Sequence, residues 1–225
     1  MFCMELFNYF RSSASYRVRI ALALKGLDYD YRSVHLARNE QFEPAFASAS
    51  ISQLVPLLRL DNGVGDGDGE QQGGTWLSQS LAIIEYLDET HPAPPLLPAS
   101  AIDRAQVRAL ALDIACEIHP LNNLRVLRYL VKEMGVDEDN KLRWYRHWVD
   151  SGLAVVEQRL KVSAGRFCHG DTPGLADCVL VPQIYNAQRF DCRLDALPEV
   201  MRVFENCMAL DAFAKTHPSV CPDAE

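Results

Sequence analysis

Residues 5–26, ELFNYFRSSASYRVRIALALKG, carry in one run the signals from which the fold can be inferred. Residues 5–9 read as a short strand, and the polar residues 11–13 form a turn. From residue 15 to 25 apolar side chains recur at helical spacing, and Gly26 ends the pattern. Serine before the first helical turn and glycine after the last one are common helix caps. The run therefore predicts a strand, a polar turn and an amphipathic helix.

The segments that follow continue the alternation of strands and helices. Further strands are predicted at 29–36, 55–60 and 76–77, and helices at 40–47 and 80–90. Pro56 stands at the entry of its strand, because proline cannot sit in the middle of a sheet. This order predicts a small mixed sheet with helices packed on it, an α/β domain over residues 1–90.

Residues 91–100, HPAPPLLPAS, contain four prolines and predict a linker, since such a stretch cannot be helical. Everything after the linker has helical periodicity. Amphipathic segments are predicted at 102–134, with an interruption at Pro120, and at 139–161, 174–190 and 198–214. We therefore expect an all-helical bundle over residues 101–225.

The composition limits the classes of function. With 48% hydrophobic and 23% charged residues, the chain has the composition of a globular protein with a real core. The net charge of −8 argues against a nucleic-acid partner, because neutralising phosphates needs a basic surface. No apolar run approaches the roughly 18 residues that a membrane span needs. The N-terminus has no signal-peptide pattern, so we expect a cytoplasmic protein with no membrane partner.

Neither the cysteines nor the acidic residues predict a metal site. The seven cysteines are odd in number and contain no C-x-x-C pair, which favours reduced and mostly buried thiols. Residues 61–69, DNGVGDGDG, resemble a calcium loop in their alternating aspartates. Gln72 stands where such a loop needs a bidentate glutamate, and no helices flank the segment. A hairpin loop between two strands is the better interpretation.

The turn at Arg11, Ser12 and Ser13 carries the first chemical signal. A helix N-terminus presents free N–H groups and about half a positive charge, which favours an anion. Serine hydroxyls at that place can hydrogen-bond a thiolate and lower its pKa from about 8.5. Plain helix capping is the alternative for these serines. The turn contains no cysteine, so disulfide exchange of the thioredoxin type is excluded.

Two more segments of the first ninety residues are candidates for holding a ligand. A cis bond before Pro56 would turn the preceding backbone outward, and Val55 would then offer its N–H and C=O to a peptide-like ligand. Gln79 and Ser80 start the next helix, whose N-terminus suits a carboxylate. Each signal alone is weak, and simple capping explains the second. Three helix or strand starts of this kind in one domain favour a ligand site.

These motifs resemble the zeta class of the glutathione transferase family. Residues 12–22, SSASYRVRIAL, are similar to the zeta signature S-S-C-x-x-R-V-R-I-A-L, and residues 79–87, QSLAIIEYL, are similar to its glutathione-binding helix. Residues 170–183 contain elements similar to its C-terminal hallmark. The resemblance covers almost the whole chain. It implies a thioredoxin-like α/β N-terminal domain followed by an all-α helical bundle, the glutathione transferase fold.

The resemblance also implies roles for individual residues. Glutathione is the implied cofactor, and its implied contacts are Gln53, Val55, Pro56, Gln79, Ser80 and His119. The implied catalytic residues are Ser12, Ser13 and Arg11. The implied substrate-binding residues are Arg11, Arg125, Arg189 and Asn123. Arginine suits this task, because its planar fork matches a carboxylate bidentately. For His119, a contact with glutathione and a purely structural hydrogen bond are both open.

The chain departs from the family pattern at several positions. Ala14 replaces the signature cysteine, so chemistry of that thiol cannot operate, while Ser12 is retained. Gly174 stands where the family's helix cap has serine or threonine, and glycine caps nearly as well. Ser50 replaces a usual proline and Gln53 a frequent lysine, and both bear on the affinity for glutathione.

The implied function is a glutathione-dependent cis–trans isomerase that converts maleylacetoacetate to fumarylacetoacetate in aromatic amino-acid catabolism. The thiol of the cofactor would act by covalent catalysis on this small maleyl diacid. The resemblance further implies a homodimer.

Three alternatives stay open from the sequence. Maleylpyruvate shares the maleyl end of the first substrate, so the sequence does not separate the two isomerisations. A zeta-type transferase or dehalogenase would use the same thiolate on small haloacids. A non-catalytic interaction module of this fold would be expected to lose the serine turn or Gln79 and Ser80, and both are present.

Overall fold

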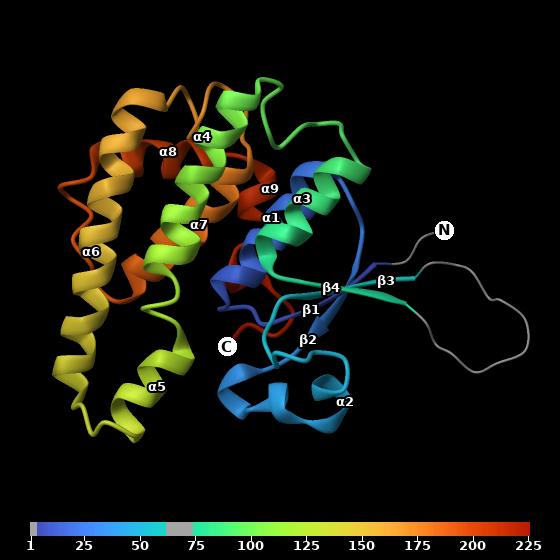
Figure 1. Cartoon of the computed structure of the whole chain (residues 1–225), viewed down its shortest axis with the longest axis vertical. Coiled ribbons are helices and arrows are strands. Elements are labelled where there is room, and N and C mark those ends of the chain that lie inside the picture. Colours follow the sequence, from blue (N-terminus) through green and yellow to red (C-terminus); the bar gives the residue numbers. More distant parts are fainter. Residues whose placement is uncertain (1–3, 62–73) are drawn as a thin grey trace, which may run out of the picture. The chain divides into compact units, whose positions relative to one another are not determined.

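A computed structural model describes residues 4–61 and 74–225 of the chain. Strand β1 (Met4–Asn8) leads through a turn into helix α1 (Ser13–Lys25), both drawn in blue in Figure 1. Ser12 caps the start of α1, and Gly26 follows its end with a φ of 64°. Glycine adopts this left-handed backbone without steric cost. The strand, the turn and the helix predicted from residues 5–26 are confirmed.

The sheet has the strand order β2-β1-β3-β4, with β2 (Asp30–Ser33), β3 (Leu57–Leu60) and β4 (Thr75–Ser78). β1 and β2 are parallel, whereas β3 is antiparallel to both β1 and β4. Helices α1 and α3 (Ser80–Thr90) lie side by side (Figure 1). The mixed sheet with its helices is the predicted α/β fold.

The helix predicted at 40–47 was wrong in its continuity. Two 3-10 turns, η1 (Leu36–Arg38) and η2 (Glu40–Phe42), precede a single α-helical turn, α2 (Pro44–Ala47). Pro44 is the physical reason, because the residue before a proline is disfavoured in helical backbone. Glu43 accordingly has extended backbone, with φ −66° and ψ 141°.

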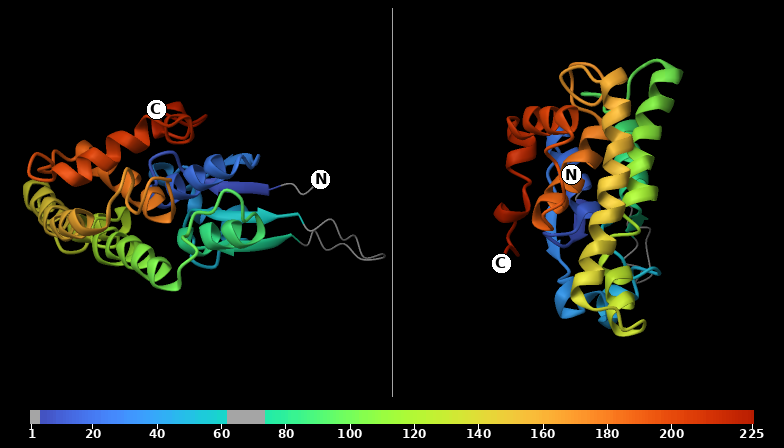
Figure 2. Two further views of the ribbon diagram at one scale, coloured as in Figure 1. Left: turned by 90° about the horizontal axis from the view of Figure 1, so that it is seen from above. Right: turned by 90° about the vertical axis from the view of Figure 1, so that its left-hand side faces the viewer.

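The second half of the chain is helical, as predicted. Its helices are α4 (Ala101–Leu112), α5 (Leu124–Lys132), α6 (Glu138–Ser163), α7 (Leu175–Arg189), α8 (Pro198–Met208) and α9 (Asp211–Ala214), with a 3-10 turn, η4 (Pro218–Val220), near the end. α7 is buried along most of its length, because it is apolar on nearly all sides. α6 packs on α5, on α8 and on the segment before α5 (Figure 2).

The predicted segment 102–134 changes its character before Pro120 is reached. α4 continues into a π-helical segment, η3 (Asp113–Ile118), in which the N–H of His119 donates to the carbonyl of Ile114 at 2.9 Å. Gly152 of α6 lies so close to η3 that a Cβ at position 152 would be 2.3 Å from Cγ1 of Ile118. This approach joins residues far apart in the sequence, so helical periodicity does not reveal it.

The chain forms two compact units, Met1–Pro94 with Ala212–Glu225, and Pro95–Asp211. The C-terminal residues therefore belong with the first unit, where the N–H of Phe10 donates to Asp223 at 3.2 Å. The division of the sequence at 1–90, 91–100 and 101–225 stays a prediction. The single helix predicted at 198–214 is divided into α8 and α9, close to the boundary between the two units at residues 211 and 212.

Two expectations from the sequence remain, one about a calcium loop and one about a membrane span. The segment interpreted as a hairpin rather than a calcium loop falls mostly in residues 62–73, which lie outside the described residues. In the ranges 4–61 and 74–225, no helix has both the length and the apolar character needed to cross a membrane.

Candidate functional site

The turn between β1 and α1 places Ser12 at the N-cap of α1. Its Oγ accepts the N–H of Ser15 at 3.2 Å, and its own N–H donates to the carbonyl of Tyr9 at 2.9 Å. The capping interpretation is therefore correct for Ser12. A hydroxyl that accepts one hydrogen bond through a lone pair keeps its proton for a second partner. Ser12 can thus cap α1 and donate to an anion at the same time.

Ser13 and Arg11 lie beside Ser12 but differ from it in accessibility. Ser13 is only 4% exposed, whereas Ser12 is half-buried, so Ser12 presents the more accessible hydroxyl. The guanidinium of Arg11 lies 4.7 Å from the ring centroid of Phe10 and donates to the backbone carbonyl of Glu225 at 3.3 Å. The turn therefore combines an accessible hydroxyl with a half-buried positive charge.

A buried arginine, for which the sequence indicated no role, holds this turn in place. Arg19 is 1% exposed, and its guanidinium donates to Oδ1 of Asn8 at 2.9 Å and to the carbonyl of Phe10 at 3.0 Å. Both acceptors belong to the end of β1 and the start of the turn. A charged residue between the apolar Val18 and Ile20 was the sequence signal that could have indicated this role.

Gln53, Val55 and Pro56 precede β3. The Val55–Pro56 peptide bond is cis, as the sequence suggested. Val55 is 9% exposed, and no hydrogen bond among the described residues involves its backbone N–H or C=O. Buried backbone groups are nearly always paired, so this segment fits an extended, peptide-like ligand. Gln53 is half-buried and has a positive φ of 53°.

The start of α3 is the third candidate segment of the first unit. Gln79 precedes the helix with a φ of 69° and makes no side-chain capping bond. The first-turn N–H groups of such a helix are left for other partners. Ser80 is buried, and its Oγ accepts from Nη1 of Arg17 at 3.3 Å. Arg17, which is 2% exposed, was also missed by the sequence analysis, and it adds positive charge at this helix start.

In the second unit, His119 and Asn123 lie together in the turn between η3 and α5. Nε2 of His119 is 3.4 Å from Nδ2 of Asn123. Oδ1 of Asn123 accepts the N–H of Arg125 at 3.1 Å and so caps α5. Both side chains of the turn are half-buried, whereas Arg125 in the first turn of α5 is exposed.

Arg189 is the last residue of α7, and its side chain is exposed. Its Nη1 donates to Oδ1 of Asn186 at 3.3 Å. The guanidinium lies 5.7 Å from the ring centroid of Tyr185 and 5.5 Å from that of Phe190. Its planar group is therefore supported by aromatic rings and keeps donors for a further partner.

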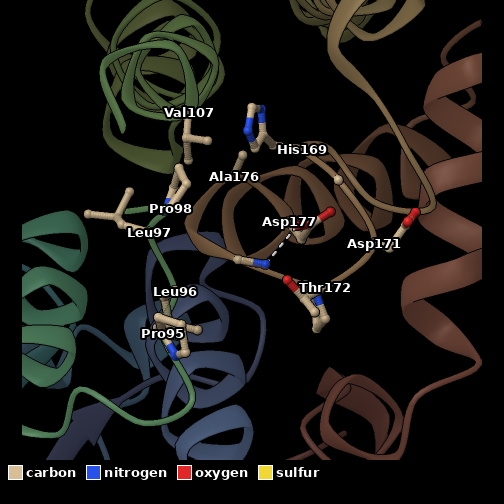
Figure 3. A pocket seen from close by; sticks show the side chains of 13 residues that line it. Pro95, Leu96, Leu97, Pro98, Val107, His169, Asp171, Thr172, Ala176 and Asp177 are labelled. Carbon is tan, nitrogen blue, oxygen red and sulfur yellow. Dashed lines mark hydrogen bonds between the residues drawn. The ribbon is translucent and has the colours of Figure 1, made fainter. Parts of the chain in front are cut away.

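A separate pocket of about 210 Å³ lies within the second unit, at the start of α7 (Figure 3). The linker residues 95–98 and residues 169–174 line it, and none of the predicted site residues does. Asp177 accepts the N–H groups of Gly174 and Cys168 at 2.8 and 2.9 Å. Burial raises the pKa of Asp177, although these two hydrogen bonds oppose the shift.

The same region explains the glycine at position 174. A Cβ on Gly174 would lie 2.7 Å from the carbonyl oxygen of Leu96, which also accepts the N–H of Leu175 at 2.8 Å. A serine or threonine would push the linker away from α7. Asp177 and the linker therefore form a structural cap rather than a ligand site.

The predicted site residues fall into the two compact units. Arg11, Ser12, Ser13, Gln53, Val55, Pro56, Gln79 and Ser80 belong to the first unit, and His119, Asn123, Arg125 and Arg189 belong to the second. Within the second unit, the contact of His119 with Asn123 unites two of them.

Comparisons with known proteins agree with this architecture. A family model for the glutathione S-transferase N-terminal domain matches residues 11–90, and one for the C-terminal domain matches residues 148–211. A probable maleylacetoacetate isomerase of Vibrio cholerae is 48% identical over the whole of both chains. A maleylpyruvate isomerase of a Ralstonia species is 44% identical over 98% of this chain and 100% of its own.

Solved structures give the same relationship. The holo structure of a maleylpyruvate isomerase, a bacterial zeta-class enzyme, superposes with a TM-score of 0.90 at 44% identity and covers 98% of this chain and 100% of its own. A maleylacetoacetate isomerase from Anaeromyxobacter dehalogenans, solved with glutathione in its active site, has a TM-score of 0.87 at 42% identity, covering 100% and 99%. The fold is that of a glutathione S-transferase. The chain belongs to the zeta class of the glutathione S-transferase family.

Proposed function

We propose that this protein is a glutathione-dependent cis–trans isomerase that converts maleylacetoacetate to fumarylacetoacetate. Relatives named maleylacetoacetate isomerase, from Pseudomonas aeruginosa and mouse, are 45% and 40% identical over nearly the whole chain. The observation that carries the proposal is the half-buried hydroxyl of Ser12 at the N-terminus of α1. It accepts a backbone N–H and keeps its proton for a thiolate.

The first unit fits glutathione as the cofactor. Val55 is buried, and its backbone groups make no hydrogen bond within residues 4–61 and 74–225, which suits the main chain of a peptide. The uncapped start of α3, at Gln79 and Ser80, suits a carboxylate, and the charge of Arg17 lies beside it. Pro56 follows Val55 directly and Gln53 precedes it by two residues, and we assign both to the same ligand.

Bound glutathione supplies a thiol that adds reversibly to the conjugated cis double bond, which allows the carbon chain to rotate. Ser12 lowers the pKa of that thiol, because its hydroxyl donates to the charged form. The N-terminus of α1 acts in the same direction through its partial positive charge. Ser13, the other serine with an implied catalytic role, is only 4% exposed, so we assign it to support of the turn rather than to contact with the thiolate.

Arginines are proposed to bind the acidic substrate. Arg11 belongs to the serine turn, and Arg125 and Arg189 are exposed on the second unit. A guanidinium binds a carboxylate through two parallel hydrogen bonds, and it stays charged at every relevant pH. A positive charge near the reacting carbonyl would also stabilise the negative charge that develops there. We assign Asn123 to the substrate and His119, whose Nε2 lies 3.4 Å from Nδ2 of Asn123, to glutathione.

Isomerisation of maleylpyruvate is the second candidate. It is favoured by a specific finding, the 44% identity to a maleylpyruvate isomerase over nearly the full chain. The two substrates share the maleyl end and differ in the remainder. Both reactions would use Ser12 in the same way, so the distinction lies in the residues that meet the remainder of the substrate.

We further propose a homodimer in the cytoplasm, with a role in aromatic amino-acid catabolism. The family resemblance supports the assembly. Most of the cysteines that the structure describes are buried and outside any disulfide, which agrees with a reducing compartment. Sedimentation at micromolar concentration tests the assembly, and a monomer would contradict it.

The experiment that tests the activity follows the loss of absorbance of the cis diacid with glutathione far below the substrate concentration. We expect many turnovers per glutathione and none without it. Maleylacetoacetate, maleylpyruvate and a small haloacid should be compared in the same assay. Stoichiometric consumption of glutathione with the haloacid, and no isomerisation of either diacid, would contradict the proposal.

A further inference from the structure

Three consecutive residues of α6, namely Trp144, Tyr145 and Arg146, contact two separate segments of the second unit. We call these three residues the α6 triplet. One contacted segment is the turn before α5, which leads to Arg125. The other is the end of α7, which carries Arg189. One stretch of a single helix thus holds Phe190, the residue after Arg189, and Leu121, four residues before Arg125.

Trp144 holds the turn before α5. Its indole Nε1–H donates to the carbonyl of Leu121 at 2.7 Å. The side chain of Asn123, two residues on, caps α5 through the N–H of Arg125 at 3.1 Å. A shift of the Leu121 carbonyl would therefore be passed to the first turn of α5, where Arg125 lies.

Tyr145 and Arg146 hold the end of α7. The ring of Tyr145 stacks on that of Phe190 with centroids 4.0 Å apart and planes at 28°. Nε of Arg146 donates to the carbonyl of Phe190 at 2.8 Å. The guanidinium of Arg189 lies 5.5 Å from the same Phe190 ring. The position of Arg189 therefore depends on a residue that α6 holds at both its ring and its carbonyl.

The carbonyls of Leu121 and Phe190, which accept these hydrogen bonds, lie outside the regular helices, where no helical N–H is available as a donor. Leu121 lies in the turn between η3 and α5, and Phe190 is the C-cap residue that follows α7. Carbonyls at helix ends need partners from elsewhere. Trp144 and Arg146 are half-buried rather than part of the apolar core, so core packing alone does not account for their hydrogen bonds.

We propose that Trp144 and Arg146 are positioning residues that fix Arg125 and Arg189 for the two ends of a diacid substrate. Because the triplet is part of one continuous 26-residue helix, the two hydrogen bonds are anchored at a constant separation. The triplet then contributes to selectivity for diacids of the maleyl type over monoacids. This inference rests on the proposed function, since it assigns the substrate end of the same site.

The test uses two substitutions that remove the donors, and Arg146→Met also removes an ion pair between Arg146 and the exposed Asp191, 3.7 Å apart. Trp144→Phe keeps an aromatic ring, and Arg146→Met keeps the apolar stem. A net hydrogen bond of this kind corresponds to about three- to tenfold in affinity. We expect KM for the diacid to rise by about that factor, with KM for glutathione unchanged within twofold and the melting temperature nearly constant.

Matched controls lie on the same helix. Trp148→Phe removes an indole N–H that donates to no residue in the described ranges, and it keeps an aromatic ring beside Trp144, whose ring centroid lies 5.7 Å from that of Trp148. Arg143→Met removes an exposed guanidinium one turn before His147. Both controls should leave KM for the diacid unchanged. A general effect of shortening tryptophan or removing charge from α6 would appear in the controls as well.

Double variants distinguish positioning from a merely structural role. In an Arg125→Ala background, Trp144→Phe should no longer raise KM for the diacid, because the residue through which it acts is gone. Arg146→Met should likewise lose its effect in an Arg189→Ala background. Effects that add in full, or that raise KM for glutathione and lower the melting temperature together, would overturn the inference.

The two proposals fail in different ways. If the wild-type protein shows no glutathione-dependent isomerisation, the proposed function fails. If the wild-type protein is active and Arg189→Ala raises KM for the diacid, whereas Trp144→Phe and Arg146→Met do not, only the positioning role fails.

Discussion

Ser12 has two roles in this structure, and two substitutions can separate them. Its Oγ accepts the N–H of Ser15 at 3.2 Å and caps α1, and its proton is the proposed donor to the thiolate of glutathione. Ser12→Ala removes both the cap and the donor. Ser12→Gly removes the donor but keeps most of the capping, because glycine is itself a good N-cap residue. The two variants should therefore agree in activity and differ in stability.

The magnitudes follow from the two interactions. Loss of a serine N-cap to alanine costs about 1 kcal/mol, and loss to glycine costs a few tenths. For a chain of this size 1 kcal/mol corresponds to about 2–4 °C in melting temperature. A hydrogen bond to a charged group contributes about 1.5–3 kcal/mol, which is about one to two decades in rate. Both variants should lose about one to two decades of turnover. Only Ser12→Ala should also lower the melting temperature by about 2–4 °C.

The assay combines steady-state isomerase kinetics with a melting curve for each variant. Ser100→Ala is the matched control, since Oγ of Ser100 caps α4 by accepting the N–H of Asp103 at 3.5 Å. We expect Ser100→Ala to lower the melting temperature and leave turnover unchanged. Glutathione affinity should change little in the Ser12 variants, because Val55, Gln79 and Ser80 are proposed to hold the rest of the tripeptide.

Two results would refute the reasoning. Ser12→Gly with wild-type turnover would show that the hydroxyl is only a cap. A neutral Ser12→Ala beside a strongly damaging Ser13→Ala would show that the wrong serine was chosen.

Three further predictions rest on single contacts. Arg189→Ala should raise KM for the diacid with little change in glutathione affinity or melting temperature, because the side chain is exposed. Arg189→Lys should recover only part of the loss. A large loss of stability with an unchanged KM would contradict this prediction. Gly152→Ala should destabilise the protein by about 1–2 kcal/mol, because a Cβ 2.3 Å from Ile118 costs more than alanine gains in helix propensity, and a raised melting temperature would speak against it. Burial raises the pKa of Glu5, but hydrogen bonds from two arginines outweigh it and leave the pKa below its usual value. The stability from this carboxylate is therefore present above the unfolded pKa of about 4.3 and is lost as the pH falls through the folded pKa. The melting temperatures of wild type and Glu5→Gln should differ at pH 7 and converge as the pH is lowered through the folded pKa.

Much of the fold was predictable, because its signals are local. The strand and helix of residues 5–26, the start of α3 at Ser80 and the left-handed Gly26 follow from periodicity and from capping residues next to each element. The family motifs then joined these elements into one fold. The helix expected at 40–47 was wrong, although its cause, Pro44, was itself local and visible in the sequence.

The candidate site was predictable to a different degree. The residues were chosen from motifs, and the capping role of Ser12 and the cis bond before Pro56 are confirmed, whereas the ligand-binding roles stay predictions. Arg17 and Arg19 were overlooked, because a charged residue on an amphipathic helix is usually solvent-exposed. Here both are buried, since carbonyl and hydroxyl oxygens from other segments accept their hydrogen bonds.

The sequence by itself determined the order of strands and helices, the helix ends and the family, because these depend on residue types at short spacing. The tertiary structure alone decided that Ser12 is more accessible than Ser13, that Gly174 makes room for the carbonyl of Leu96, and that α6 supports both Leu121 and Phe190. Each of these features depends on which distant segment fills the space beside a residue. That choice is made by packing of the whole unit, and no local pattern encodes it.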